Sequence, residues 1–348
     1  MALIRRADIV IVGGGIVGAA TARALTSSGR SVVLLERFSL GNKNGSSHGR
    51  SRIFRLSYPD PAFVEMALQA QSLWQRLETD SGESLLRTMG ALDVGEGIET
   101  NAKALETSGI PCELTDGKSI SERFHSVTFD TYEPVLFQPD GGIIAADRSV
   151  TAFARVAVEG GVEIREGEPA TALEPGADGV RVRTEHGIFD AGVVVVTAGA
   201  WAKPLLATAG IDLDVRVTRE TVSYFELLGE PPPPLVEWGD PATYALASPG
   251  QGLKAAQHIA GPEVDPDSEK ATSNHSAEIT SAWVQRRFPT ANDTPHLLET
   301  CLYTNTDDER FILERHGPIV VGSACSGHGF KFAPVTGERL ASLAQGLT

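Results

Sequence analysis

The chain has 348 residues, of which 41% are hydrophobic and 22% charged, which is typical of a globular protein of about two domains. Its formal net charge of −15 repels phosphate backbones and anionic membrane surfaces, which argues against nucleic acid or a membrane as a partner. No apolar run approaches the ~18 to 20 residues of a membrane helix, and residues 9–20 do not resemble a signal peptide, so we expect a soluble, cytoplasmic protein.

The first segments of the chain predict a strand, a tight turn, a helix and a second strand. A β-branched apolar run at 7–12 stops at a glycine-rich turn, and the alanine-rich stretch 19–25 favours a helix that ends at Gly29. Residues 31–35 predict the second strand, so this part of the chain forms a βαβ unit.

The middle of the chain changes character after an amphipathic helix expected over 61–80. Strands at 86–94 and 132–138, separated by polar connections, are more typical of an antiparallel sheet than of further βαβ units. The first domain is expected to resume after that, with a helix at 149–159 and strands at 162–165, 179–184 and 192–196.

The last part of the chain again predicts strands, at 215–228 and 242–247, joined by a stiff connector of four prolines. An acidic stretch at 263–278 is interpreted as a loop or lid edge, and it is followed by a helix at 279–288, strands at 300–304 and 318–323, and a closing helix at 336–344.

This alternation of elements predicts an α/β fold of two interleaved domains. We assign residues 1–80, 147–210 and 300–348 to a Rossmann-like nucleotide-binding domain. The segments 81–146 and 211–299 are assigned to an α+β substrate domain built on an antiparallel sheet.

A Gly-x-Gly-x-x-Gly motif at Gly13, Gly15 and Gly18 stands between the first strand and the first helix. Gly13 permits the turn, Gly15 lets a pyrophosphate approach the backbone, and Gly18 allows the helix to pack closely on the strand. Glu36, at the end of the second strand, can accept hydrogen bonds from a ribose diol. The pattern predicts a dinucleotide site, with a purely structural turn as the alternative, and by itself it fits FAD as well as a nicotinamide cofactor.

The segment 44–55 is rich in glycine and serine and then strongly basic, although the protein is acidic. Arg52 and Arg55 are three residues apart, so in a helix they would share a face and could bind a carboxylate. A solvated basic turn is the alternative interpretation.

A second segment, 325–332, contains two glycines around His328, then Lys331 between two phenylalanines. This pattern indicates backbone held close to a flat ligand with one cation directed at it. A glycine-rich helix cap with an exposed lysine is the alternative.

Three cysteines, Cys112, Cys301 and Cys325, are too few and too scattered for a disulfide framework or a metal cluster. We therefore expect no metal site.

Five motifs occur together in this chain: the glycine turn with Glu36, Ser-His-Gly-x-x-Arg-x-x-Arg at 47–55, Thr-Ala-Gly-Ala-Trp at 197–201, the strand 300–304, and 326–332. Together they resemble the monomeric sarcosine oxidase and N-methyltryptophan oxidase family, within the D-amino-acid oxidase-like FAD-dependent oxidoreductases. The resemblance covers nearly the whole chain. It implies FAD, a monomer, and oxidation of the C–N bond of a small secondary or N-methyl amino acid to an imine, with oxygen reduced to hydrogen peroxide.

The resemblance also implies roles for single residues. Lys254 matches the lysine held responsible for oxygen activation, Arg52 an arginine on the flavin face, and Lys331 a lysine that holds the substrate carboxylate. We expect Arg52 to share that carboxylate with Lys331. His258 and Tyr244 match substrate-pocket residues. The residues expected to bind FAD are Gly13, Gly15, Ile16, Val17, Gly18, Glu36, Arg37, Ser46, His48, Arg52, Ala170, Ala198, Gly199, Trp201, Cys301, Gly327, His328, Gly329, Phe330 and Lys331.

Cys301 matches the family cysteine that carries a thioether to the flavin 8-methyl carbon, whereas Cys112 and Cys325 are interpreted as core residues. Arg55 matches a residue in the neighbourhood of the flavin.

Two departures from the family pattern bear on the substrate. Ser47 stands where sarcosine oxidases often have a second histidine, and residues 245–251 differ from their aromatic, glycine-rich loop. A cyclic or modified amine, such as pipecolate, a glycated amino acid or a biosynthetic intermediate, is therefore an alternative substrate. A non-catalytic dinucleotide-binding protein or a nicotinamide-dependent protein is the alternative from another class.

Overall fold

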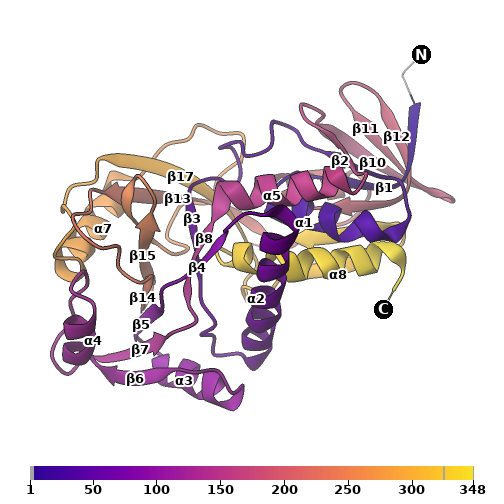
Figure 1. Cartoon of the computed structure of the whole chain (residues 1–348). Coiled ribbons are helices and arrows are strands. Elements are labelled where there is room, and N and C mark those ends of the chain that lie inside the picture. The colour runs from indigo at the N-terminus through magenta and orange to yellow at the C-terminus, as the bar shows by residue number, and fades with distance from the viewer. Residues whose placement is uncertain (1–3, 324–325, 348) are drawn as a thin grey trace.

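The computed structural model describes residues 4–323 and 326–347, so Cys325 lies outside the described residues. Two large sheets and a small third sheet organise the chain, and α1, α5 and α8 run along the first of them (Figure 1).

The first sheet has a parallel core in the order β19-β12-β1-β2-β9, to which a β10–β11 hairpin and β18 add antiparallel strands. Its strands are β1 (Ile4–Val12), β2 (Val32–Leu35), β9 (Glu163–Arg165), β10 (Ala170–Gly176), β11 (Gly179–Thr184), β12 (Ile188–Val196), β18 (Ile312–His316) and β19 (Ile319–Ser323).

Both faces of this parallel core are buried, which explains why its strands are continuous apolar runs. Ile9 and Ile11 pack with Leu340 beneath the helices, whereas Val10 and Val12 pack on the opposite face. The helices on the first face are α1 (Ile16–Ala24, extended by η1, Leu25–Ser28), α5 (Ala146–Glu159) and α8 (Ala333–Gln345). The short η2 (Gly199–Trp201) and α6 (Ala202–Ala207) follow β12, and Ala202 packs with the second face.

The second sheet has the order β17-β13-β16-β15-β14-β5-β7-β6 and is antiparallel except where β14 pairs with β5. Its strands are β5 (Ala91–Gly95), β6 (Glu113–Asp116), β7 (Pro134–Gln138), β13 (Arg216–Phe225), β14 (Leu235–Trp238), β15 (Thr243–Ser248), β16 (Gly252–Gln257) and β17 (Leu297–Asn305). The helices α3 (Ile98–Thr107), α4 (Gly117–Arg123) and α7 (Asn274–Arg287) accompany this sheet.

The two faces of the second sheet differ because side chains alternate along each strand. Ala245, Leu253 and Ala255 point to one face and pack with Trp283 of α7. Lys254 lies between Leu253 and Ala255 in β16 and therefore points to the other face of the sheet, which we call the cavity face.

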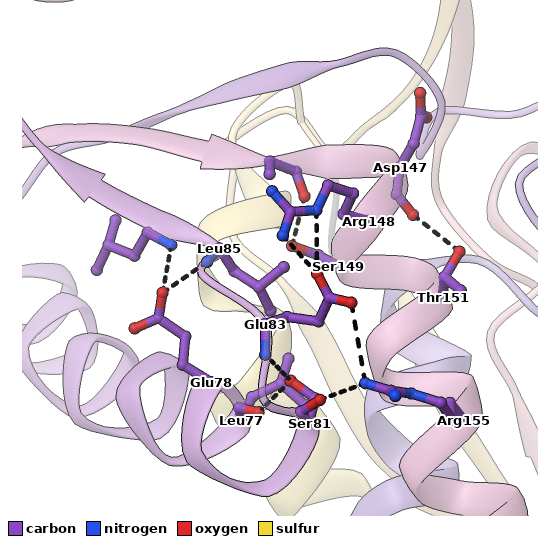
Figure 2. A network of polar contacts seen from close by, with 12 residues as sticks. Leu77, Glu78, Ser81, Glu83, Leu85, Asp147, Arg148, Ser149, Thr151 and Arg155 are labelled. Carbon is purple, nitrogen blue, oxygen red and sulfur yellow. Dashed lines mark hydrogen bonds and ion pairs between the residues drawn. The ribbon is translucent and has the colours of Figure 1, made fainter.

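The third sheet, β4 (Leu86–Thr88), β8 (Gly142–Ala145) and β3 (Ser51–Phe54), lies where the chain crosses between the large sheets. A polar network holds this junction, joining the end of α2 (Pro61–Ser81) to the start of α5 (Figure 2). Arg148 Nε lies 3.1 Å from Glu83, and Glu78 accepts hydrogen bonds from the Leu85 and Leu86 amides. The Asp147 carboxylate points away from this network (Figure 2).

The predicted fold class is confirmed by this architecture, but several predicted elements are wrong in detail. Residues 86–94 form two strands rather than one, and the helix predicted from 279 begins at Asn274, capped by Ser273. The helix considered for 44–55 is absent, because residues 51–54 form β3. The division into domains stays a prediction. β17 pairs with β13, so residues 300–305 lie in the second sheet although the prediction groups them with the first.

No helix within 4–323 or 326–347 has the length and apolar character needed to cross a bilayer.

Candidate active site

A cavity of about 970 Å³ is lined by residues from both large sheets. Among the predicted site residues, all but Gly18 and His48 line it. Gly18 packs directly behind the turn, and the buried His48 ring lies with Nδ1 3.1 Å from the Gly45 carbonyl oxygen. The sequence motifs therefore converge on one place, although they are spread from residue 13 to residue 331.

The glycine turn forms one end of this cavity. Gly13 has φ +107°, a conformation that side chains rarely adopt, and a Cβ at Gly18 would clash with the Gly13 carbonyl oxygen. Gly15 has an ordinary φ of −67° and serves as the N-cap of α1 without a side-chain cap. The Ser47 hydroxyl accepts a hydrogen bond from the Ile16 amide at 3.0 Å. The open backbone at the start of α1 is suited to an anionic phosphate.

Glu36 stands beside this turn. Its carboxylate accepts hydrogen bonds from the amides of Gly14 (2.7 Å) and Phe38 (2.8 Å). Burial raises the pKa of Glu36, and these two hydrogen bonds oppose that effect. The side chain is thus fixed, and its remaining lone pairs can accept from a diol. The glycine cradle and Glu36 together fit the pyrophosphate and ribose of a dinucleotide.

Arg37, Trp201 and Asp267 form a group at the cavity margin. Trp201 Nε1 donates to Asp267 at 2.9 Å, and Arg37 lies 3.1 Å from the same carboxylate and over the Trp201 ring. Asp267 belongs to the predicted acidic loop, which therefore lies at the edge of the cavity.

Arg52 and Lys254 form a first pair of cations in the cavity wall. Arg52 donates to the carbonyl oxygens of Ser46 (2.8 Å), His48 (2.7 Å) and Ser51 (2.9 Å), which fixes its guanidinium. Lys254 is only 6% exposed. Burial, and then the neighbouring Arg52 charge, lowers the pKa of Lys254 to about 7.

Lys331 and Arg55 form a second pair of cations. Lys331 Nζ donates to Tyr58 Oη at 2.8 Å and to the His328 carbonyl oxygen at 3.1 Å. The Arg55 guanidinium lies between the rings of Tyr58 (4.0 Å) and Trp238 (4.8 Å). Burial, and then the Arg55 charge, holds the pKa of Lys331 well below its ordinary value. A carboxylate that enters the cavity would favour the protonated form of Lys331, so Arg55 and Lys331 are together suited to bind it.

The charge that acts on Lys331 is that of Arg55 rather than Arg52, whereas the sharing of a substrate carboxylate by Arg52 and Lys331 stays a prediction. Strand β3 explains this difference. Side chains three residues apart point to opposite sides of a strand, whereas in a helix they share a side. Arg52 and Arg55 accordingly enter two different cation pairs.

Asp93 is a buried acid that the sequence analysis missed. Its carboxylate accepts hydrogen bonds from Ser57 Oγ (2.6 Å), Gln138 Nε2 (2.6 Å) and Trp238 Nε1 (3.0 Å). Trp238 is also the ring against which the Arg55 guanidinium lies. Burial raises the pKa of Asp93, and the Arg55 charge opposes that effect. The one signal in the sequence was an acid between two apolar residues of a strand.

Two tyrosines and a histidine border the same cavity. Tyr244 Oη lies 3.5 Å from Tyr303 Oη, and burial raises the pKa of Tyr244 to about 12, so this hydroxyl is neutral near pH 7. His258 Nε2 lies 3.7 Å from Glu309 at the cavity edge. Cys301 lines the cavity from β17, with Sγ 4.0 Å from the Ser46 carbonyl oxygen.

Comparison with known proteins identifies the family. The model of the FAD dependent oxidoreductase (DAO) family matches residues 8–343. The chain belongs to this family of FAD-dependent oxidoreductases. The expected use of FAD is thereby confirmed.

Sarcosine oxidases are among its relatives. The chain is 33% identical to the monomeric sarcosine oxidase of Streptomyces avermitilis, covering 97% of this chain and 93% of the relative. It is 32% identical to the peroxisomal sarcosine oxidase of Mus musculus, covering 98% and 92%. The solved structure of NikD, an unusual amino acid oxidase essential for nikkomycin biosynthesis, matches with a TM-score of 0.88 at 29% identity, covering 98% and 94%. The resemblance inferred from the motifs is confirmed.

Proposed function

We propose that the protein oxidises the C–N bond of a small secondary or N-methyl amino acid to an imine, with transfer of the electrons to oxygen and formation of hydrogen peroxide. The observation that carries this proposal is the buried pair of Arg55 and Lys331 in the cavity that also contains the glycine cradle. The sarcosine oxidases among the relatives support it.

Substrate binding begins with the carboxylate, which Arg55 and Lys331 would hold. Tyr58 fixes Lys331 by a hydrogen bond and Arg55 by stacking, so little side-chain freedom is lost when the substrate binds. FAD, when bound, accepts the hydride equivalent from the carbon next to nitrogen. The protein contributes orientation, because a carboxylate held by two fixed cations places the amine reproducibly.

Lys254 and Arg52 would serve the second half of the reaction. A positive charge held in a dry site stabilises negative charge that develops on oxygen far better than one in water. Lys254 is buried beside Arg52, which is consistent with this role.

We propose further that Cys301 attaches FAD covalently. A C–S bond would form between Sγ and the flavin 8-methyl carbon, the S–H bond and one C–H bond of that methyl group would break, and the released electron pair would pass through the flavin to oxygen. Cys301 lines the cavity and lies close to Ser46, another predicted flavin contact, which supports the assignment. Acid precipitation of the purified protein tests it, since covalently held flavin stays with the protein and reversibly bound flavin does not.

A cyclic or modified amine is the second candidate substrate. Val236, Trp238 and Leu246 give the cavity an apolar wall, which favours a ring over a bare methyl group. The division into two interleaved domains, a monomeric state and a cytoplasmic location are proposed as well. The monomeric sarcosine oxidase among the relatives supports the monomeric state.

The decisive experiment is the visible spectrum of the purified protein under anaerobic conditions, before and after excess sarcosine, with L-pipecolate in parallel. Bleaching by sarcosine supports the first substrate class, and bleaching by pipecolate alone supports the second. A matched pair of variants tests the anchor: Arg55→Met should weaken bleaching, whereas Arg50→Met, which changes an arginine that donates to the Pro249 carbonyl oxygen, should not. A yellow protein that neither amino acid bleaches contradicts the proposal.

A further inference from the structure

Tyr224 and Glu299 share the cavity face of the second sheet with Lys254, Tyr224 from the adjacent strand β13 and Glu299 from the next strand, β17. In the strand register, Tyr224 is opposite Lys254, and Glu299 is opposite Val222. Because alternate residues share a face, all four side chains point to the same side of the sheet. Neither Glu299 nor Tyr224 is among the described residues that line the cavity.

The Glu299 carboxylate is held from two directions. Tyr224 Oη donates to it at 2.9 Å from the interior, and Lys43 Nζ lies 3.1 Å away on the surface side. The Glu299 side chain is 18% exposed, whereas that of Lys43 is 72% exposed. Burial opposes ionisation, yet the bonds from Lys43 and Tyr224 hold the pKa of Glu299 below its ordinary value. Glu299 therefore carries a negative charge near pH 7.

The groups that face Lys254 come from every element packed against it. Those whose charges are coupled to Lys254 are Arg52 of β3, His48 of the preceding loop, Asp147 of α5, and Glu299 and Cys301 of β17. By strand register, Tyr224 and Glu220 of β13, Tyr244 of β15 and Tyr303 of β17 share the same face. Burial, and then the Arg52 charge, lowers the pKa of His48 to about 4, so His48 is neutral near pH 7. A Cys301 thioether would carry no charge. Asp147 and Glu299 are then the acids whose charges act on Lys254. The Glu220 carboxylate, on the same face, is instead held by the Thr218 hydroxyl and the amides of Ala260 and Gly261.

We propose that Glu299, oriented by the Tyr224 hydroxyl, is the counter-charge of Lys254 and thereby a positioning residue for the oxygen half of the reaction. The inference rests on the proposed role of Lys254. Glu299 acts through Lys254, since it does not line the cavity itself. Asp147 of α5 provides a second negative charge. Burial favours the neutral form of its carboxyl group and raises its pKa, so this charge is the weaker candidate.

Glu299→Gln tests the proposal, because it removes the charge and keeps the shape. Loss of a nearby negative charge disfavours protonated Lys254, so the pH at which Lys254 loses its proton should fall by about one unit. A fall of one unit lowers the protonated fraction of Lys254 by up to about ten-fold at pH values above its pKa, so reoxidation of the flavin should slow by up to about ten-fold in that range. Two readouts follow this change. One is the visible spectrum of the oxidised holoenzyme titrated from pH 5 to 9, and the other is the rate of reoxidation after photoreduction.

Photoreduction needs no substrate, which separates this test from the choice of amine. Tyr224→Phe keeps the charge but releases its orientation, so the same pH shift should appear with smaller size. Lys43→Met removes the surface cation and should shift the titration upward. A Glu299→Gln enzyme with the wild-type spectral titration and pH–rate profile overturns the inference. If Lys254→Met reoxidises like wild type, the proposed role of Lys254 is wrong instead. If Glu299→Gln does not fold, Lys43→Met still decides, because an unchanged titration contradicts the proposal.

Discussion

Replacing Gly15 with alanine separates the binding of FAD from the stability of the fold. Gly15 has φ −67° and ψ −176°, which alanine adopts without strain, and an added Cβ would lie 3.1 Å from Ser47 Oγ. That hydroxyl sits on a short side chain that can shift by a few tenths of an ångström, so the apoprotein should lose less than about 1 kcal/mol. A methyl group at the closest approach of a phosphate costs about 1 to 3 kcal/mol, which weakens FAD binding roughly 5- to 150-fold.

The measurement requires reversible binding, so we expect it to work best in the Cys301→Ser background. The apoprotein is titrated with FAD, and flavin fluorescence and the melting temperatures of both forms are recorded. Gly45→Ala is the matched control in the same cavity, because its Cβ would meet only Trp201 at 3.8 Å. Gly18→Ala is the opposite control, since its clash with the Gly13 carbonyl oxygen destabilises the apoprotein itself. Unchanged FAD affinity in Gly15→Ala, or a loss of apoprotein stability as large as in Gly18→Ala, would refute the reasoning.

Three further outcomes are expected. Cys301→Ser should release its flavin on acid precipitation, and the assignment fails if the wild-type flavin is already released. Arg55→Met should raise the amino-acid concentration for half-maximal anaerobic bleaching at least about ten-fold, through loss of a charge-assisted contact, and an effect no larger than that of Arg50→Met would contradict this anchor. Arg287 binds Glu133 (2.6 Å) and Glu237 (2.7 Å), which lowers the pKa of both acids, so wild-type stability should fall as the pH drops below about 4.5. Arg287→Met should cost about 2 to 4 kcal/mol in urea unfolding at pH 7 and flatten this acid dependence, and an unchanged midpoint would argue against it.

The first sheet could be predicted from the sequence because its central strands are buried on both faces. Residues 7–12 and 192–196 are apolar at nearly every position, and the glycine turn follows the first of them directly. The dinucleotide end of the site is likewise contained in one short segment whose glycines have separate physical tasks. Local sequence therefore sufficed for this half of the molecule.

The substrate end could not be predicted, because it depends on contacts between distant segments. Arg55, Asp93 and Trp238 meet only through the pairing of β5 with β14, and the assignment of a strand at 51–54 decides which way Arg55 points. The start of α7 was missed although Ser273 caps it, since a polar acidic stretch reads equally well as a loop. In each case tertiary packing selected among conformations that the local sequence left open.

The pairing of β1 with β12 has a consequence for how the protein is made. Thr197, just after β12, donates to the Gly13 carbonyl oxygen, a contact between residues 184 positions apart. β2 can cover one edge of β1 early, but at about 5 to 20 residues per second the ribosome needs roughly 10 to 40 seconds to supply β12, the partner on the other edge. Lys331, at the other end of the cavity, emerges later still. For about half of synthesis the nascent chain thus exposes the apolar edge of β1 that β12 later covers, and the cavity walls are complete only in a chain that is almost complete.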